Sequence, residues 1–162
     1  MTMTPNTLTQ IRNFAAPISI GAGAIGIVRH ATPSHMTRIA GLAAGLAGAD
    51  ALANGDRATT SMLGSAMQTF GGFTLFAAKA PKTALAGGIL TAGGATTNAI
   101  EKWLPQSSNK FVNPFVKAIV MGGAAGGAIG AMSKDLEDAA IGTVVGAFVG
   151  LCVGAVKGSM DM

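Results

Sequence analysis

Few side chains in this chain can do chemistry, and two of them lie inside largely uncharged stretches. Asp50 interrupts an apolar run, and Gln68 lies within the longest uncharged run, 58–78. An acidic residue in a membrane span is a functional-site candidate by default, and an amide there can bond to a neighbouring helix or line a wet passage. Asp50 also lies near the end of its run, where its carboxylate can reach water or pair with Arg38 or Arg57. We therefore take Asp50 and Gln68 as a candidate intramembrane polar site.

The other reactive side chains form no catalytic or metal-binding pattern. His30 and His35 lie in one predicted loop without a Cys, Asp or Glu nearby in the sequence, so we expect solvated histidines rather than metal ligands. Cys152 is the only cysteine, and we interpret it as a small apolar helix residue. The run GAGAIG at 21–26 follows no predicted strand, which favours helix packing over a dinucleotide loop. We expect no enzyme, no cofactor and no metal ion.

The clearest pattern is a glycine at every fourth position near the carboxyl end. The row consists of Gly142, Gly146, Gly150, Gly154 and Gly158, and a second row in the preceding segment consists of Gly122, Gly126 and Gly130. In a water-exposed helix each glycine is unfavourable by roughly 1 kcal/mol against alanine. Between membrane helices the same pattern lets two backbones approach closely. The sequence predicts helix packing at these glycines, within a hairpin of 118–133 and 139–156 joined by the charged turn KDLED.

The composition points to a surface that does not face water. Of 162 residues, 49% are hydrophobic and 11% are charged, against roughly 25% charged in soluble domains. These charges are too few to cover the surface of a soluble domain. The surface therefore either faces lipid or is buried in an assembly. The formal net charge is +4, but the basic residues are scattered singly, which argues against a nucleic-acid site and suits loops near anionic lipid head groups.

The uncharged runs predict an all-α fold. They cover 14–28, 39–55, 58–78, 83–100, 118–133 and 139–156, with only Asp50 inside them. We expect a membrane-embedded bundle of about four to six short Gly/Ala-rich helices packed by faces with a small residue at every fourth position. Several runs are short for a span, since fifteen helical residues reach about 22 Å. Two small-residue rows in 83–100 predict that this helix lies between partners.

The chain divides at two polar stretches. Residues 1–13 contain no Asp or Glu and predict a disordered polar tail. Residues 101–117 contain two prolines together with Trp and Phe among lysines, which favours an interfacial loop. We therefore expect a tail at 1–13, a helical bundle at 14–100, a loop at 101–117 and a glycine-zipper hairpin at 118–158.

The glycine row resembles the glycine-zipper pattern of small bacterial membrane and surface proteins. This resemblance covers residues 118–158 and describes a way of packing helices. The general plan of short Gly-rich spans is similar to that of the mitochondrial Tim17/22/23 family, and residues 134–138 ahead of GTVVG resemble that family's loop. The resemblance assigns no functional residue.

Three functions are compatible with these patterns. The first is an integral membrane protein that self-associates through its glycine faces and forms or supports a pore or translocation assembly. It implies a lipid bilayer and a homo-oligomer or membrane protein as partners, and no nucleic acid. The second is a secreted effector or phage-type protein that inserts into a host membrane, because the acid-free amino end resembles type III export signals and the Lys and Arg distribution fixes no topology. The third is a structural protein whose apolar surface is buried in a large assembly.

Overall fold

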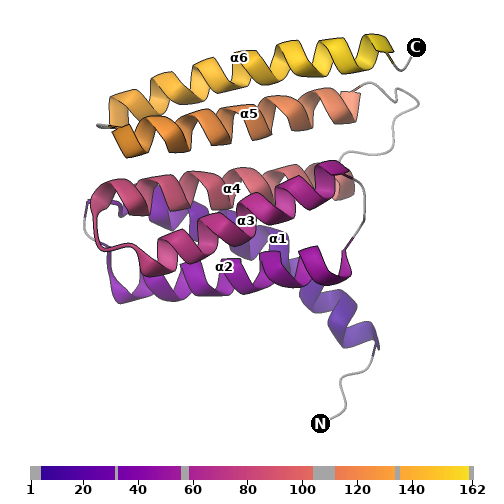
Figure 1. The fold of residues 1–162 in the computed structure, drawn as a ribbon. Coiled ribbons are helices and arrows are strands. Elements are labelled where there is room, and N and C mark those ends of the chain that lie inside the picture. The colour runs from indigo at the N-terminus through magenta and orange to yellow at the C-terminus, as the bar shows by residue number, and fades with distance from the viewer. Residues whose placement is uncertain (1–4, 32, 56–58, 104–111, 134–135, 161–162) are drawn as a thin grey trace.

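The computed structural model describes residues 5–31, 33–55, 59–103, 112–133 and 136–160. Six α-helices occupy nearly all of this part of the chain: α1 (Pro5–Val28), α2 (His35–Asn54), α3 (Thr59–Ala77), α4 (Pro81–Trp103), α5 (Val112–Ser133) and α6 (Leu136–Met160) (Figure 1). The described residues contain no strand. The predicted all-α class is confirmed.

All of the described helices except α3 are longer than the uncharged runs that predicted them, and α3 (Thr59–Ala77) lies within its run, 58–78. The shortest, α3, has 19 residues and the longest, α6, has 25. At about 1.5 Å per residue, 20 residues reach about 30 Å, the thickness of the hydrocarbon core. The uncharged runs underestimate the lengths of these helices, because a helix continues into polar residues when its backbone hydrogen bonds continue.

The polar stretches at 1–13 and 101–117 differ from expectation. Helix α1 begins at Pro5, so the tail expected as disordered is helical from that residue onward. Helix α4 extends to Trp103 and α5 begins at Val112, so 101–103 and 112–117 of the expected loop are helical, and 104–111 lie outside the described residues. Pro17, at the fourth position of the uncharged run 14–28, lies inside α1 because the helix begins well before that run.

Local sequence signals explain several helix starts. The Ser34 hydroxyl accepts a hydrogen bond from the backbone N–H of Thr37 and so caps α2. Pro81 is the first residue of α4, a position where its missing N–H removes no helical bond. Glu137 and Asp138 lie in the first turn of α6, where the helix dipole favours negative charge.

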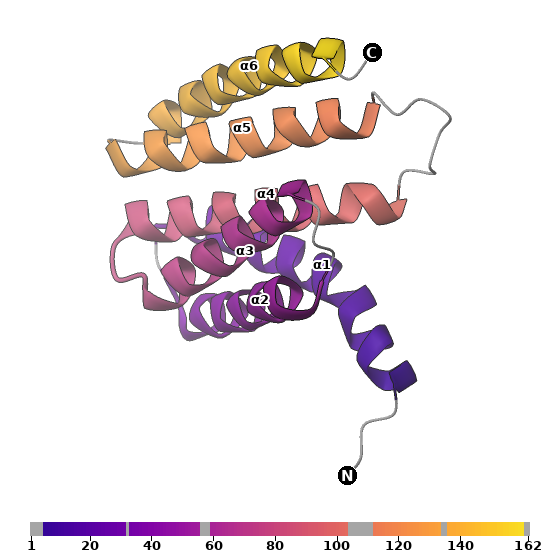
Figure 2. The same ribbon diagram turned by 45° about the vertical axis from the view of Figure 1, so that its right-hand side comes forward.

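The six helices form a four-helix ring with a hairpin on one side. In the ring α1 contacts α2 and α4, and α3 contacts α2 and α4. The hairpin of α5 and α6 packs on this ring through α4 (Figures 1 and 2). Helix α4 therefore lies between partners, as its two small-residue rows predicted. Because consecutive helices run in opposite directions, the carboxyl ends of α1, α3 and α5 and the amino ends of α2, α4 and α6 lie at one end of the molecule (Figure 1).

Small side chains make up most of the core. Among the residues whose burial is described, the largest fully buried side chains are Leu75, Thr37, Thr91, Thr97 and Ser19. A Cβ atom at Gly23 of α1 would lie 2.7 Å from that of Ala92 of α4, and one at Gly72 of α3 would lie 2.6 Å from the Cα of Gly45 of α2. The backbones of neighbouring helices thus touch where a larger side chain has no room.

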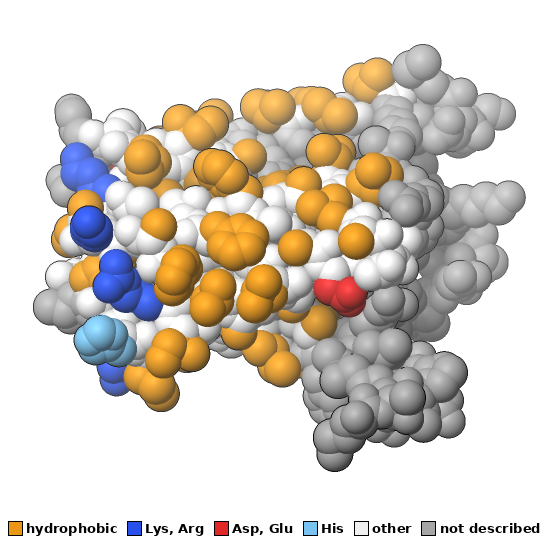
Figure 3. All heavy atoms as spheres, turned by 60° about the horizontal axis from the view of Figure 1, so that its bottom comes forward, with side chains coloured by type: hydrophobic (Ala, Val, Ile, Leu, Met, Phe, Trp, Pro, Cys, Tyr) orange, Lys and Arg blue, Asp and Glu red, His pale blue; other side chains and the backbone are white. Residues whose placement is uncertain are grey.

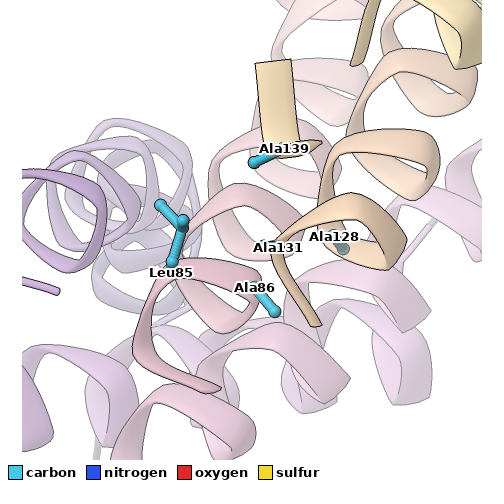
Figure 4. Close-up of a cluster of buried hydrophobic side chains, with 5 residues drawn as sticks. All are labelled: Leu85, Ala86, Ala128, Ala131 and Ala139. Carbon is cyan, nitrogen blue, oxygen red and sulfur yellow. The ribbon is translucent and has the colours of Figure 1, made fainter. Parts of the chain in front are cut away.

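An alanine-rich cluster joins the hairpin to the ring. Leu85 and Ala86 of α4 pack with Ala128 and Ala131 of α5 and Ala139 of α6 (Figure 4). Apart from Leu85 these buried side chains are single methyl groups, which lets the backbones approach closely, and the partly buried Ile27, Ile89 and Leu90 pack against them.

Candidate functional site

The predicted glycine rows lie opposite each other within one chain. A Cβ at Gly126 would collide with the carbonyl oxygen of Gly142 and lie 3.0 Å from the Cα of Gly146. Gly122 likewise meets the carbonyl oxygen of Gly146, and Gly146 meets that of Gly122. This reciprocal contact means that the two helices approach backbone to backbone.

The remaining row members extend the same α5–α6 interface. A Cβ at Gly130 would meet the carbonyl oxygen of Asp138, one at Gly150 would meet that of Ala118, and one at Gly154 would lie 3.1 Å from the Phe115 ring. Gly158 lies near the carboxyl end of α6, and its surroundings fall outside the description.

The outward face of α6 carries its large apolar side chains. Val144 is 69% exposed and Phe148 is 65% exposed. The same face contains Ile141, Val145, Val149, Val153 and Val156, all more than half exposed. Helix α6 thus has glycines inside and branched or aromatic side chains outside, the reverse of an amphipathic helix in a soluble protein.

A second apolar surface covers α2 and α3. Its most exposed members are Met36, Ile39, Leu46 and Phe70, each more than half exposed. In Figure 3 hydrophobic side chains occupy the middle of this face, and Lys and Arg side chains gather at one end. The apolar surface is therefore not confined to the hairpin.

Gln68 lies in a buried polar cluster inside the four-helix ring. Its side-chain amide donates to the Ser19 hydroxyl at 2.8 Å and to the Ala44 carbonyl at 3.3 Å, which links α3 to α1 and α2. Asn98 of α4 donates to the Ser65 hydroxyl of α3 at 2.9 Å, and its buried Oδ1 has no hydrogen-bond partner. Each of the four helices therefore contributes a polar group to the interior.

Sequence reasoning singled out Gln68 but missed Ser19 and Asn98. Both lie in small-residue runs where a polar side chain is a weak signal. Their partners lie on other helices, 49 residues apart for Ser19 and Gln68 and 33 apart for Asn98 and Ser65. Single-sequence spacing carries no information about such pairs.

Asp50 does not join this cluster. It is exposed on α2, and its Oδ1 accepts a hydrogen bond from the Asn54 side chain at 2.9 Å, one helical turn further on. The two members of the candidate intramembrane polar site are thus separate, with Gln68 in the interior and Asp50 near the carboxyl end of α2.

The histidines and the cysteine lie apart from one another. His30 lies just after α1 and bonds the Ile27 carbonyl through Nδ1 at 2.6 Å, while His35 is exposed at the start of α2. Cys152 is exposed on α6. Within the described ranges no three His, Cys, Asp or Glu side chains form a group that could hold a metal ion.

Basic residues lie at the end of the molecule where α1 ends and α2 and α4 begin. Arg29 and His30 follow α1, Arg38 lies in the first turn of α2, and Lys79 and Lys82 flank the start of α4. Arg38 donates through Nε to the Phe76 carbonyl at 3.2 Å, and Lys82 donates through Nζ to the Ser133 carbonyl at 3.3 Å. We call this region, defined by these five residues, the basic end.

Comparisons with protein-family models, curated proteins and solved structures find no match to this chain. The resemblances to glycine-zipper proteins and to the Tim17/22/23 family stay predictions.

Proposed function

We propose that this chain is an integral membrane protein whose α5–α6 hairpin crosses the bilayer. Within the described part, Phe115–Ser133 and Leu136–Val156 are long and apolar enough to span a membrane. Length and composition alone are weak support, because the core helix of a soluble protein meets the same criterion. The burial pattern adds the physical argument.

The observation that carries the proposal is the placement of residue sizes. Glycine and alanine fill the α5–α6 interface, while Val144, Val145 and Phe148 point away from it. In water the hydrophobic effect would favour the opposite arrangement, since each large apolar side chain gains about 1.5–3 kcal/mol when buried. In lipid the outer side chains are already in an apolar solvent, and close backbone contact holds the helices together.

We extend the proposal to an assembly that forms or supports a passage across the membrane. The polar cluster around Gln68 supports it, because buried polar groups in membrane helices are associated with helix association and transport. The glycine rows face each other within one chain, so we assign self-association to the outer apolar surfaces instead. A passage in this proposal lies between chains, since the Gln68 amide is bonded to Ser19 and to the Ala44 carbonyl inside the ring.

Fractionation of cells that express the chain tests the membrane proposal. We expect the chain to sediment with membranes and to stay in the pellet after an alkaline carbonate wash, which releases peripheral proteins. Recovery in the supernatant before the wash would overturn the proposal and favour a structural protein buried in an assembly.

A second candidate, insertion into a host membrane after export, is favoured by the position of the hairpin. Helix α6 packs mainly on α5 and meets the ring at Ala139 in the alanine-rich cluster, so the hairpin is the peripheral part of the described fold. Such a unit can leave the ring and insert later. Deleting residues 2–13 should stop export and leave membrane affinity unchanged, and unaffected export would rule out this candidate.

A further inference from the structure

The basic end contains a cavity of about 370 Å³. Its walls come from Ala80, Pro81 and Leu85 at the start of α4, and from Ala131 of α5 and Leu136 of α6. His30 and Lys82 supply the polar groups of the lining. Leu85 and Ala131 also belong to the cluster in Figure 4, so the cavity floor is the apolar contact between ring and hairpin. This volume falls within the range of roughly 300–1,000 Å³ for ligand pockets.

Among the described residues that line this cavity, the charged side chain is the basic Lys82. The Lys82 ammonium uses one donor on the Ser133 carbonyl, and an ammonium has three donors. The amino end of the 23-residue helix α4 forms one wall, and its dipole adds partial positive charge. Lys79 is exposed nearby, and Figure 3 shows Lys, Arg and His side chains gathered at this end. Glu137, in the first turn of α6, is the nearest described acidic residue in sequence to the wall residue Leu136.

We propose that this cavity binds one anionic phospholipid, with the phosphate at Lys82 and His30 and the start of an acyl chain against Leu85 and Ala131. The proposal rests on the proposed membrane location, which places the ends of the helices at head-group depth. Charge complementarity selects an anionic head group, and the apolar floor selects a ligand with a hydrocarbon part. A free phosphate would bind at Lys82 and His30 and would leave the apolar floor of the cavity unoccupied.

Native mass spectrometry of the detergent-purified chain tests this site. With equal amounts of phosphatidylglycerol and phosphatidylcholine present, we expect one phosphatidylglycerol retained per chain. Lys82→Gln should weaken its binding about fivefold, the effect of roughly one basic residue near a lipid surface. Ala80→Leu should also displace the lipid, because the larger side chain fills the cavity and leaves the charge unchanged.

Lys79→Gln is the matched control, since Lys79 belongs to the basic end but does not line the cavity. We expect it to change lipid binding much less than Lys82→Gln. Equal effects of the two lysine variants, equal retention of both lipids, or no effect of Ala80→Leu would each overturn the proposal. Glycerol phosphate that competes as well as phosphatidylglycerol would also overturn it, because the acyl chain would then have no role.

Flotation with pure phosphatidylcholine vesicles separates this inference from the proposed function. A chain that floats with these vesicles but retains both lipids equally keeps the membrane proposal and loses the lipid site. A chain that does not float loses the membrane proposal, while the retention measurement in detergent still decides whether the cavity prefers an anionic lipid.

Discussion

Gly126 and Gly21 are both helical glycines, but their surroundings differ. A Cβ at Gly126 would collide with the Gly142 backbone, whereas a Cβ at Gly21 would meet nothing within 4 Å. Gly21 therefore has no packing role in this chain, and alanine is the better helix former there. A small residue at every fourth position therefore indicates helix packing only where the backbone of a second helix lies opposite.

Gly126→Ala should destabilise the fold by about 1–3 kcal/mol, because the added methyl group forces α5 and α6 apart. Gly21→Ala should be neutral or stabilising, by up to about 1 kcal/mol. Unfolding of the purified chain by increasing SDS in mild detergent, followed by circular dichroism, measures both. Equal midpoints for the two variants would contradict the packing role of Gly126.

Gln68 is the residue on which the polar cluster depends, since its amide joins three helices. Gln68→Leu keeps the volume and removes the donors, and we expect a loss of about 0.6–2 kcal/mol in SDS unfolding, the range for bonds between membrane helices. A double-mutant cycle with Ser19→Ala isolates the Gln68–Ser19 bond. Strictly additive effects would show that this bond contributes nothing to stability.

At the scale of elements, the α5–α6 hairpin is a unit defined by its glycine interface. The same rows can in principle pair between two chains, as the sequence alone allowed. The structure pairs them within one chain, and a Cβ at Gly123 would lie 3.5 Å from the Cβ of Ala147. This separation is at the short end of the range of about 3.5–4.5 Å found across disulfides.

Cysteines at Gly123 and Ala147, in a Cys152→Ala background, should therefore form a disulfide within one chain. Non-reducing gel electrophoresis should show a monomer whose mobility changes on reduction. Cysteines at Gly123 and Val145 are the control, because Val145 lies on the outer face and should not cross-link. Cross-linked dimers from the first pair would contradict the intrachain hairpin and favour glycine-mediated oligomers.

The sequence predicts these elements well and their ends poorly. Uncharged runs locate all six helices because charges are rare and concentrate near the connections. They miss the polar start of α1 and the Glu101–Trp103 end of α4, because helix formation there needs only backbone bonds and permissive side chains. The cluster of Ser19, Gln68 and Asn98 and the cavity at the basic end depend on helices that meet in space, which no spacing within one run encodes.

At the scale of the whole molecule, small side chains lie inside and large apolar side chains lie outside, which is the opposite of a soluble helical bundle. Among the described residues the interior is built mainly from Gly, Ala, Ser and Thr, Leu75 is the largest fully buried side chain, and Phe70, Phe148 and Val144 face outward. Among the described residues, the Lys and Arg side chains visible in Figure 3 lie at one end of that face. The proposed membrane location would place the outward apolar side chains in the hydrocarbon core and the basic end among the head groups.

The most direct test of this account is the reactivity of a single cysteine at Val145, near the middle of the Leu136–Val156 span, in a Cys152→Ala background. Only the thiolate form of a cysteine reacts with N-ethylmaleimide, and a thiol in hydrocarbon does not ionise. We therefore predict that the cysteine at Val145 is labelled in intact membranes at least about tenfold more slowly than a cysteine at Lys79 on the basic end. Solubilisation in SDS should make the two rates equal. Equal rates in intact membranes would mean that the outer face of α6 meets water, and would contradict the membrane location.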